Sequence, residues 1–203
     1  VTGPLTDTLL GRLAVLSDER DGYTNALYEH DDYDNLNQSS IKGSLAWQAT
    51  EKFDIALIAD YTDSSEICCF GNPVGYNREA SLVRDPAVGL NDYYLRTAQA
   101  NFNTQRDLLN LDPDDRETQL NSLPSNDNTE KGVVIDVNWD LDFAELRSIS
   151  GYRDWKYNSK GDFDFGPVDI GELEEDYTVD NYSQEFNLTG TLAELDFVES
   201  IEY

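Results

Sequence analysis

The fold is decided by one stretch of the sequence, Ile41-Lys-Gly-Ser-Leu-Ala-Trp-Gln-Ala-Thr-Glu-Lys-Phe-Asp-Ile-Ala-Leu-Ile-Ala-Asp-Tyr61. Apolar residues alternate with mostly polar or small ones along 41–48 and again along 53–62, and the two halves are separated by Ala49-Thr-Glu-Lys52. A period of two puts successive side chains on opposite faces of a β-strand. The stretch therefore predicts a β-hairpin with a short turn.

Alternation of the same kind recurs on both sides of this hairpin. It runs through 9–16 before the hairpin and through 133–140, 143–157, 182–189 and 196–203 after it. Together with the two strands of the hairpin, these segments predict an all-β protein of about seven antiparallel strands.

The predicted connections alternate between long and short. Those after the first, third and fifth strands are about 20, 65 and 22 residues long, whereas the others have about 3–6 residues. In an up-and-down meander, this alternation places every long loop at the same end of the sheet. Outer-membrane β-barrels have short periplasmic turns and long external loops. We therefore expect residues 1–203 to form part of a transmembrane β-barrel, with a long external loop at about 63–130.

Aromatic residues mark the ends of the predicted strands. Trp47 and Phe53 flank one short turn. Trp139 lies directly before another short turn, and Tyr61 lies at the opposite end of its strand. Two aromatic bands with aliphatic residues between them are typical of the two lipid–water boundaries of a barrel. The residues predicted to face lipid or to form these girdles are Ile41, Leu45, Trp47, Phe53, Ile55, Leu57, Tyr61, Val133, Ile135, Val137 and Trp139.

Charge and composition exclude several classes of function. The 203 residues include 41 acidic and 14 basic ones, for a net charge of −27, whereas a nucleic-acid partner would need a basic surface. No apolar window approaches the length of about 18 residues that a transmembrane helix requires. One His and two adjacent cysteines, Cys68 and Cys69, fit none of the usual metal-ligand spacings. We therefore expect no such metal site and no cofactor.

Carboxylates are the most plentiful candidates for chemistry. An acid pair for hydrolysis needs two carboxyl groups at a set separation with opposed pKa values, and the sequence shows neither. His30 would be required for a Ser-His-Asp or Cys-His mechanism, and no nucleophile motif accompanies it. The prediction is therefore that the chain is not an enzyme. Calcium is a more credible ligand, and its candidate sites are Asp31, Asp32 and Asp34, or Asp112, Asp114 and Asp115, although neither cluster has the EF-hand pattern.

Several segments resemble the barrel region of TonB-dependent outer-membrane receptors. The order and spacing of these segments carry the resemblance more than any single motif does. Cys68-Cys69 also resembles the paired cysteines of some members. The segments are Gly3-Pro-Leu-Thr-Asp-Thr-Leu-Leu-Gly-Arg-Leu-Ala14 with Asp21-Gly-Tyr23, Leu45-Ala-Trp-Gln-Ala-Thr-Glu-Lys-Phe-Asp-Ile-Ala56, Leu146-Arg-Ser-Ile-Ser-Gly-Tyr-Arg-Asp154 and Tyr182-Ser-Gln-Glu-Phe-Asn-Leu188.

The resemblance implies a non-enzymatic transporter in the outer membrane of a Gram-negative bacterium. Such receptors import scarce nutrients, most often ferric siderophores, and are energised by the TonB complex. The sequence departs from the family pattern because it has no plug domain, no TonB-contacting motif and no terminal aromatic strand. We therefore expect an internal piece of a longer protein, since lipid does not tolerate unpaired strand edges. The expected partners are outer-membrane lipid, the TonB complex through the N-terminal region, and a small ligand such as a ferric siderophore.

Ligand recognition is expected in the long loop and on the barrel interior. Cationic and aromatic side chains in the loop could contact an anionic or catechol-type ligand, or could simply pack and solubilise the loop. These candidate ligand-contact residues are Arg78, Arg84, Tyr93, Tyr94 and Arg96. Interior polar residues are expected to pair with one another or to line water, and they include Lys42, Asp54, Asp60, Asp136 and Arg153.

A soluble acidic β-sheet binding module, with calcium as its candidate ion, is the alternative function. The two hypotheses differ in the surroundings of the apolar side chains. In a barrel wall, Ile41, Leu57 and Ile135 would face lipid. In the soluble module, a second layer of protein would bury them.

Overall fold

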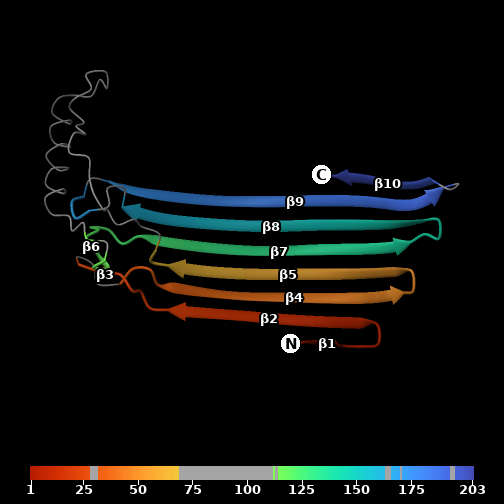
Figure 1. Ribbon diagram of the computed structural model, residues 1–203, viewed down its shortest axis with the longest axis horizontal. Helices are drawn as coiled ribbons and strands as arrows, with labels where there is room; N and C mark the ends of the chain where they lie inside the picture. Colours follow the sequence, from red (N-terminus) through yellow and green to blue (C-terminus); the bar gives the residue numbers. More distant parts are fainter. Residues whose placement is uncertain (28–31, 69–111, 113, 163–165, 170, 193–194) are drawn as a thin grey trace, which may run out of the picture.

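The chain forms one open antiparallel sheet in the computed structural model, which describes residues 1–27, 32–68, 112, 114–162, 166–169, 171–192 and 195–203. The strands follow one another along the chain, each beside the next, as an up-and-down meander (Figure 1). A second, small sheet pairs two short strands in parallel. The strands of the large sheet are β1 (Thr2–Pro4), β2 (Leu9–Arg20), β4 (Leu36–Thr50), β5 (Phe53–Glu66), β7 (Ser125–Asp140), β8 (Ala144–Asp162), β9 (Glu172–Leu192) and β10 (Leu195–Glu202), and those of the small sheet are β3 (Asn25–Ala26) and β6 (Glu117–Thr118).

The predicted all-β meander is confirmed, with eight strands in the sheet instead of about seven. The additional strand is β1, which has three residues and is therefore too short to show alternation. It pairs with β2 at the edge of the described sheet, with Gly3 opposite Gly11. An edge position tolerates Pro4, which has no backbone N–H to donate.

The strands extend further toward the long connections than the apolar pattern indicates. β5 continues to Glu66 and β7 begins at Ser125, both inside the range 63–130 that the sequence assigns to the long loop. Likewise, β9 begins at Glu172, well before the predicted start at 182. These extensions lack apolar alternation, so hydrophobic periodicity could not reveal them.

Polar side chains link the extensions across neighbouring strands. Ser65 Oγ donates a hydrogen bond to Asp127 Oδ1 at 2.6 Å, and Thr129 Oγ1 donates one to Asp63 Oδ1 at 3.0 Å. Cross-strand pairs of this kind stabilise a sheet without requiring an apolar face. The sheet therefore continues past its apolar part as a polar extension.

The short turns lie together at the end of the sheet opposite β3 and β6 (Figure 1). In the β7–β8 turn, Asp142 has a φ of 71°, and its N–H donates to Asp140 Oδ1 at 2.8 Å, a geometry that Asp readily adopts. Asp142 also forms an ion pair with Lys52 of the β4–β5 turn. This hydrogen-bonded pair raises the pKa of Lys52. The long connections start from the other end of the sheet, as the loop lengths predict.

The two faces of the sheet differ in chemistry because the register aligns similar residues across the strands. Leu57 lies opposite Leu45 and Ile135, whereas Asp60 lies opposite Lys42 and Gly132. We call these the apolar face and the polar face, respectively. All the predicted lipid-facing residues share the apolar face and none of them is buried: Ile41, Leu45, Trp47, Phe53, Ile55, Leu57, Tyr61, Val133, Ile135, Val137 and Trp139.

The apolar part of this face has the length of one transmembrane β-strand crossing. Phe53 packs edge-on against Trp139 at its lower end, with ring centroids 6.0 Å apart, and Tyr61 marks its upper end. At about 3.3 Å per residue, Phe53 and Tyr61 are about 26 Å apart along β5. Because strands of outer-membrane barrels are tilted, about 9–11 residues form one crossing, and the nine residues from Phe53 to Tyr61 have this length. In the same row as Tyr61, Lys131 and Asp154 form an ion pair at 3.1 Å, so the face becomes polar there.

The most deeply buried large side chains lie outside the sheet, among the connections near β3 and β6. Tyr33, Leu120 and Pro124 are all less than 2% exposed. We call these three residues the loop-end core. The Tyr33 hydroxyl donates to the Ser122 carbonyl at 3.3 Å, although the two residues are 89 positions apart in the sequence. Connections that are distant in the sequence therefore pack together.

Backbone contacts tie this core to the large sheet. Asp34 N donates to Ile67 O at 2.7 Å, and Ile67 N donates to Asn35 Oδ1 at 2.6 Å. The next residue, Cys68, is disulfide-bonded, and the only other cysteine of the chain, Cys69, lies outside the described residues. In the part of the chain that the structure describes, no helix is long and apolar enough to cross a membrane.

Candidate functional site

A three-residue charge cluster lies on the polar face. Arg153 of β8 contacts Glu130 of β7, with Nη1 2.5 Å from Oε1. The same guanidinium contacts Asp60 of β5, with Nη1 and Nη2 each 3.2 Å from a carboxylate oxygen. Arg153 therefore bridges three strands and neutralises one of its two carboxylate partners.

Gly132 provides the space for this bridge. It lies on β7 between Asp60 and Arg153 in the register. A Cβ atom at Gly132 would be only 2.9 Å from Arg153 Nη2, so any other residue would displace the guanidinium. By contrast, no atom lies within 4 Å of a Cβ built at Gly43.

Gly132→Ala is expected to weaken the bridge, and Gly43→Ala is the matched control. Alanine reduces the entropy of the unfolded chain, so Gly43→Ala should stabilise the protein by about 0.5–1 kcal/mol. Gly132→Ala should give a free energy of unfolding about 1 kcal/mol lower than that of Gly43→Ala, because the partly exposed Arg153–Asp60 pair loses hydrogen bonds. Chemical unfolding of the full-length protein in detergent measures this difference. A double-mutant cycle with Asp60→Asn assigns it to the Arg153–Asp60 pair. Equal effects of the two alanine substitutions would contradict the role given to Gly132.

Other carboxylates on the polar face also have partners. Arg147 binds Asp136 through two hydrogen bonds, Nε to Oδ1 at 3.0 Å and Nη2 to Oδ2 at 2.6 Å. Asn138 Nδ2 donates to Asp54 Oδ2 at 2.9 Å. Asp60 and Arg153 thus pair with each other as expected, whereas Asp54 and Asp136 use Asn138 and Arg147, which the sequence reasoning did not single out.

Three aromatic side chains continue along the polar face beyond this cluster. Trp155 and Tyr157 follow Arg153 at alternate positions of β8, and Tyr177 of β9 lies directly opposite Tyr157. The Trp155 and Tyr157 rings are 5.6 Å apart at 36°, and the Tyr157 and Tyr177 rings are 6.0 Å apart at 25°. We call Trp155, Tyr157 and Tyr177 the aromatic strip.

The aromatic strip differs in position from the aromatic girdle. Tyr152 and Tyr182, on the same two strands, both lie on the apolar face, with ring centroids 4.7 Å apart. The strip lies on the opposite face, which also carries the ion pairs. A role as a membrane anchor therefore does not explain it.

Hydrogen bonds hold the two ends of the strip. Trp155 Nε1 donates to Asn128 Oδ1, and the Tyr177 hydroxyl donates to Glu175 Oε1 at 3.2 Å. The hydrogen bond to Glu175 and the charge of this carboxylate raise the pKa of Tyr177. Such a strip can stack on flat rings and can attract cations to the ring faces.

The sequence reasoning missed the strip, although a signal was present. Trp155 and Tyr157 lie in the predicted strand 143–157, and counting by twos from Arg153 places both on the polar face. The candidate ligand-contact residues predicted from the sequence lie outside the described residues: Arg78, Arg84, Tyr93, Tyr94 and Arg96.

The calcium candidates are described only in part. Asp31 lies outside the described residues. Asp34 accepts a hydrogen bond from Thr24 at 2.6 Å, and Asp112 accepts one from the backbone N–H of Asp114 at 3.0 Å. Within the described ranges, no three His, Cys, Asp or Glu side chains are placed to hold a metal ion together.

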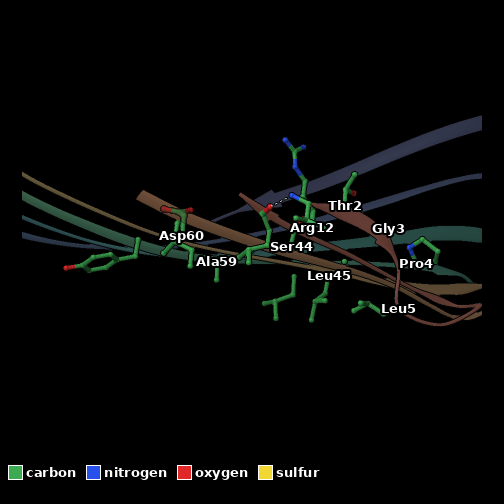
Figure 2. A pocket seen from close by; sticks show the side chains of 16 residues that line it. Thr2, Gly3, Pro4, Leu5, Arg12, Ser44, Leu45, Ala59 and Asp60 are labelled. Carbon is green, nitrogen blue, oxygen red and sulfur yellow. Dashed lines mark hydrogen bonds between the residues drawn. The ribbon is translucent and has the colours of Figure 1, made fainter. Parts of the chain in front are cut away.

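A hollow of 880 Å³ lies mainly among apolar side chains of β1, β2, β4 and β5 (Figure 2). Small residues, Gly43 and Ala59, lie side by side on neighbouring strands at its floor. In Figure 2, Leu5 and Leu45 point to one side of the sheet and Arg12 points to the other. Leu45, Leu57 and Tyr61, which line part of this hollow, lie on the apolar face.

Comparison with known proteins identifies the fold. The sequence matches no protein-family model and no curated protein at a significant level. The structure, however, is similar to the crystal structure of the ferric yersiniabactin uptake receptor FyuA from Yersinia pestis, with a TM-score of 0.65 over 99% of this chain. The fold is that of part of FyuA. The two sequences are 12% identical, and this chain covers 27% of the FyuA chain.

The likeness to FyuA supports the sequence interpretation at the level of fold. FyuA is a TonB-dependent receptor, so the predicted resemblance to that family is confirmed for the architecture of this segment.

Proposed function

We propose that this chain is a wall segment of a TonB-dependent transporter in the outer membrane of a Gram-negative bacterium. The longer protein would import a scarce nutrient such as a ferric siderophore, with energy supplied by the TonB complex acting through its N-terminal region. The observation that carries the proposal is a single-layered meander with one apolar face and one ion-paired face. This arrangement is what a wall between lipid and a water-filled lumen requires.

The dimensions of the apolar face support this orientation. Leu57 and Ile135 lie between an aromatic band at Trp139 and another at Tyr61. The nine residues from Phe53 to Tyr61 match the length of about 9–11 residues that a tilted transmembrane strand needs. In the proposal, this face contacts lipid and the polar face lines the lumen. The short turns then lie on the periplasmic side, and the region at about 63–130 contributes an external loop.

Two groups of residues are the proposed ligand contacts. The first is the loop set predicted from the sequence, Arg78, Arg84, Tyr93, Tyr94 and Arg96. The second is the aromatic strip, which lies on the proposed lumen side and toward the external end. Both groups would meet a nutrient as it enters from outside.

The soluble binding module is the weaker alternative. It requires a second layer over the apolar face, whereas the eight strands of the large sheet form a single layer in the described residues. Large side chains such as Ile41, Trp47 and Ile135 are more than 40% exposed there. An apolar surface of this extent marks contact with a membrane or with another protein.

Uptake by cells tests the proposed function. A strain that lacks the full-length gene and its own siderophore synthesis is supplied with single ferric siderophores and radioactive iron. We expect at least one of them to be taken up only when the gene is restored, and only in cells with a working TonB complex. A protein that does not fractionate with the outer membrane would refute the proposal, as would uptake that is independent of TonB.

A further inference from the structure

The rings of the aromatic strip are partly exposed on the polar face of the sheet. Trp155 is 37% exposed and Tyr177 is 47% exposed, although both stack on Tyr157. Their neighbours on the polar face are ion-paired or hydrogen-bonded, so water is the expected medium on this face. Exposed aromatic side chains in a polar setting are typical of a recognition surface.

The charges around the strip are almost all negative. Glu130 lies opposite Trp155 at the inner end, and Glu175 contacts Tyr177 at the outer end. Glu66 of β5 belongs to the same outermost row of the polar face as Glu175, through the pairings of Asn126 and Ser159. An anionic ligand that stacks on the strip would therefore approach three carboxylates.

No free cation offsets these carboxylates on the same four strands. From Asp60 to the outer ends of β5, β7, β8 and β9, the polar face carries a single Arg or Lys in the described residues, which is Arg153. Its guanidinium already binds both Asp60 and Glu130, so the cluster as a whole has a net charge of −1. The lysines of β8, Lys156 and Lys160, alternate onto the other face.

We propose that the aromatic strip binds a ligand that carries a flat ring and a positive charge, and that it discriminates against anionic ligands. The ring would stack on Trp155 and Tyr177, and the cation would lie near Glu175 and the ring faces. This inference rests on the proposed function, because it requires the polar face to line the lumen. It restricts the candidate nutrients to those whose part in contact with the strip carries no negative charge.

Three matched probes test the charge preference. Naphthalen-1-ylmethylamine is cationic, 1-naphthalenemethanol is neutral and 1-naphthoate is anionic, while their ring systems are the same. Binding to the full-length protein in detergent is measured by calorimetric titration. We expect affinity to fall in the order cation, neutral, anion, with about a tenfold difference between cation and anion.

Variants assign the binding to the strip. Trp155→Ala, and separately Tyr177→Ala, should weaken all three probes several-fold, whereas Glu175→Gln should weaken the cation and strengthen the anion without changing the neutral probe. Tyr182→Ala is the control, because this exposed tyrosine lies on the apolar face of β9. Using two aromatic variants keeps the test decisive if one of them fails to fold.

The proposal is overturned if the anionic probe binds as tightly as the cationic one. It is also overturned if no probe binds, or if Tyr182→Ala has the same effect as the two strip variants. These results would leave the proposed function intact as long as uptake still depends on TonB. Conversely, a protein absent from the outer membrane would refute the transporter, while the order of probe affinities would still be measurable.

Discussion

Leu57→Arg is expected to destabilise the folded full-length protein in a bilayer by about 2–4 kcal/mol, the cost of a basic residue near the midplane of the lipid face of a barrel. Leu57 lies on the apolar face midway between Phe53 and Tyr61 on β5. An arginine there would have to leave water or thin the bilayer around its guanidinium. Equilibrium unfolding from lipid vesicles by guanidinium chloride measures the loss.

Ile58→Arg is the matched control, because it places the same charge one residue away on the opposite face. Ile58 lies opposite Ser44 and Val134 on the polar face, where we expect water and nearby carboxylates to accommodate the guanidinium. The expected change is below about 1 kcal/mol, as for most surface substitutions. Equal destabilisation by the two arginines would show that the two faces of β5 have the same surroundings, contrary to the proposal.

Leu120→Ala should produce the second large effect, a loss of about 2–5 kcal/mol in the local stability of the loop-end core. Leu120 is 1% exposed, so its truncation leaves a cavity or forces its neighbours to shift. Two nearby backbone hydrogen bonds report on that core. Asn25 N donates to Arg116 O, and Leu27 N donates to Thr118 O. Amide hydrogen exchange at Asn25 and Leu27 should accelerate accordingly.

Leu123→Ala controls for the loss of an apolar side chain in the same connection. Leu123 is 38% exposed, so its truncation creates little cavity and should leave exchange at Asn25 and Leu27 nearly unchanged. We also expect exchange in β4 and β5 to be unaffected by Leu120→Ala. Accelerated exchange throughout the sheet would mean that the loop-end core and the sheet unfold as one unit.

The apolar part of the sheet was predictable because its strands alternate between an apolar face and a polar face. Between Ile41 and Tyr61, every second residue contributes to one face, and this produces the period-two pattern that identified the hairpin. The turn between these strands was predictable for the same reason, since the pattern stops at Thr50 and resumes at Phe53. Strand pairing and direction then followed from the short connections.

The polar extensions were not predictable from periodicity. In Glu172-Leu-Glu-Glu-Asp-Tyr-Thr-Val-Asp180, acidic residues occur on both faces of β9, because this part projects beyond the apolar band. A strand with polar groups on both sides carries no hydrophobic signal. Its pairing with β8 depends on the backbone ladder and on contacts such as Tyr157 with Tyr177.

The loop-end core and the Arg153 bridge depend on contacts between distant segments. The Tyr33 hydroxyl, for example, reaches the Ser122 carbonyl, and the two residues are 89 positions apart in the sequence. The Arg153–Asp60 pair requires a register in which Gly132 lies between them. The aromatic strip was the exception, since its side could have been deduced by extending the alternation of β8 from Arg153 to Trp155.

The central claim is that one face of the sheet contacts lipid and the other contacts water. Site-directed spin labelling of β5 tests it most directly, with single cysteines at 53–62 in a cysteine-free background of the full-length protein in vesicles. Collisions with oxygen, which is concentrated in lipid, should peak at Ile55, Leu57 and Ala59. Collisions with a water-soluble nickel complex should peak instead at Asp54, Ala56 and Ile58. If labels at Ile55 and Leu57 are shielded from both reagents, protein covers the apolar face and the barrel-wall account is wrong.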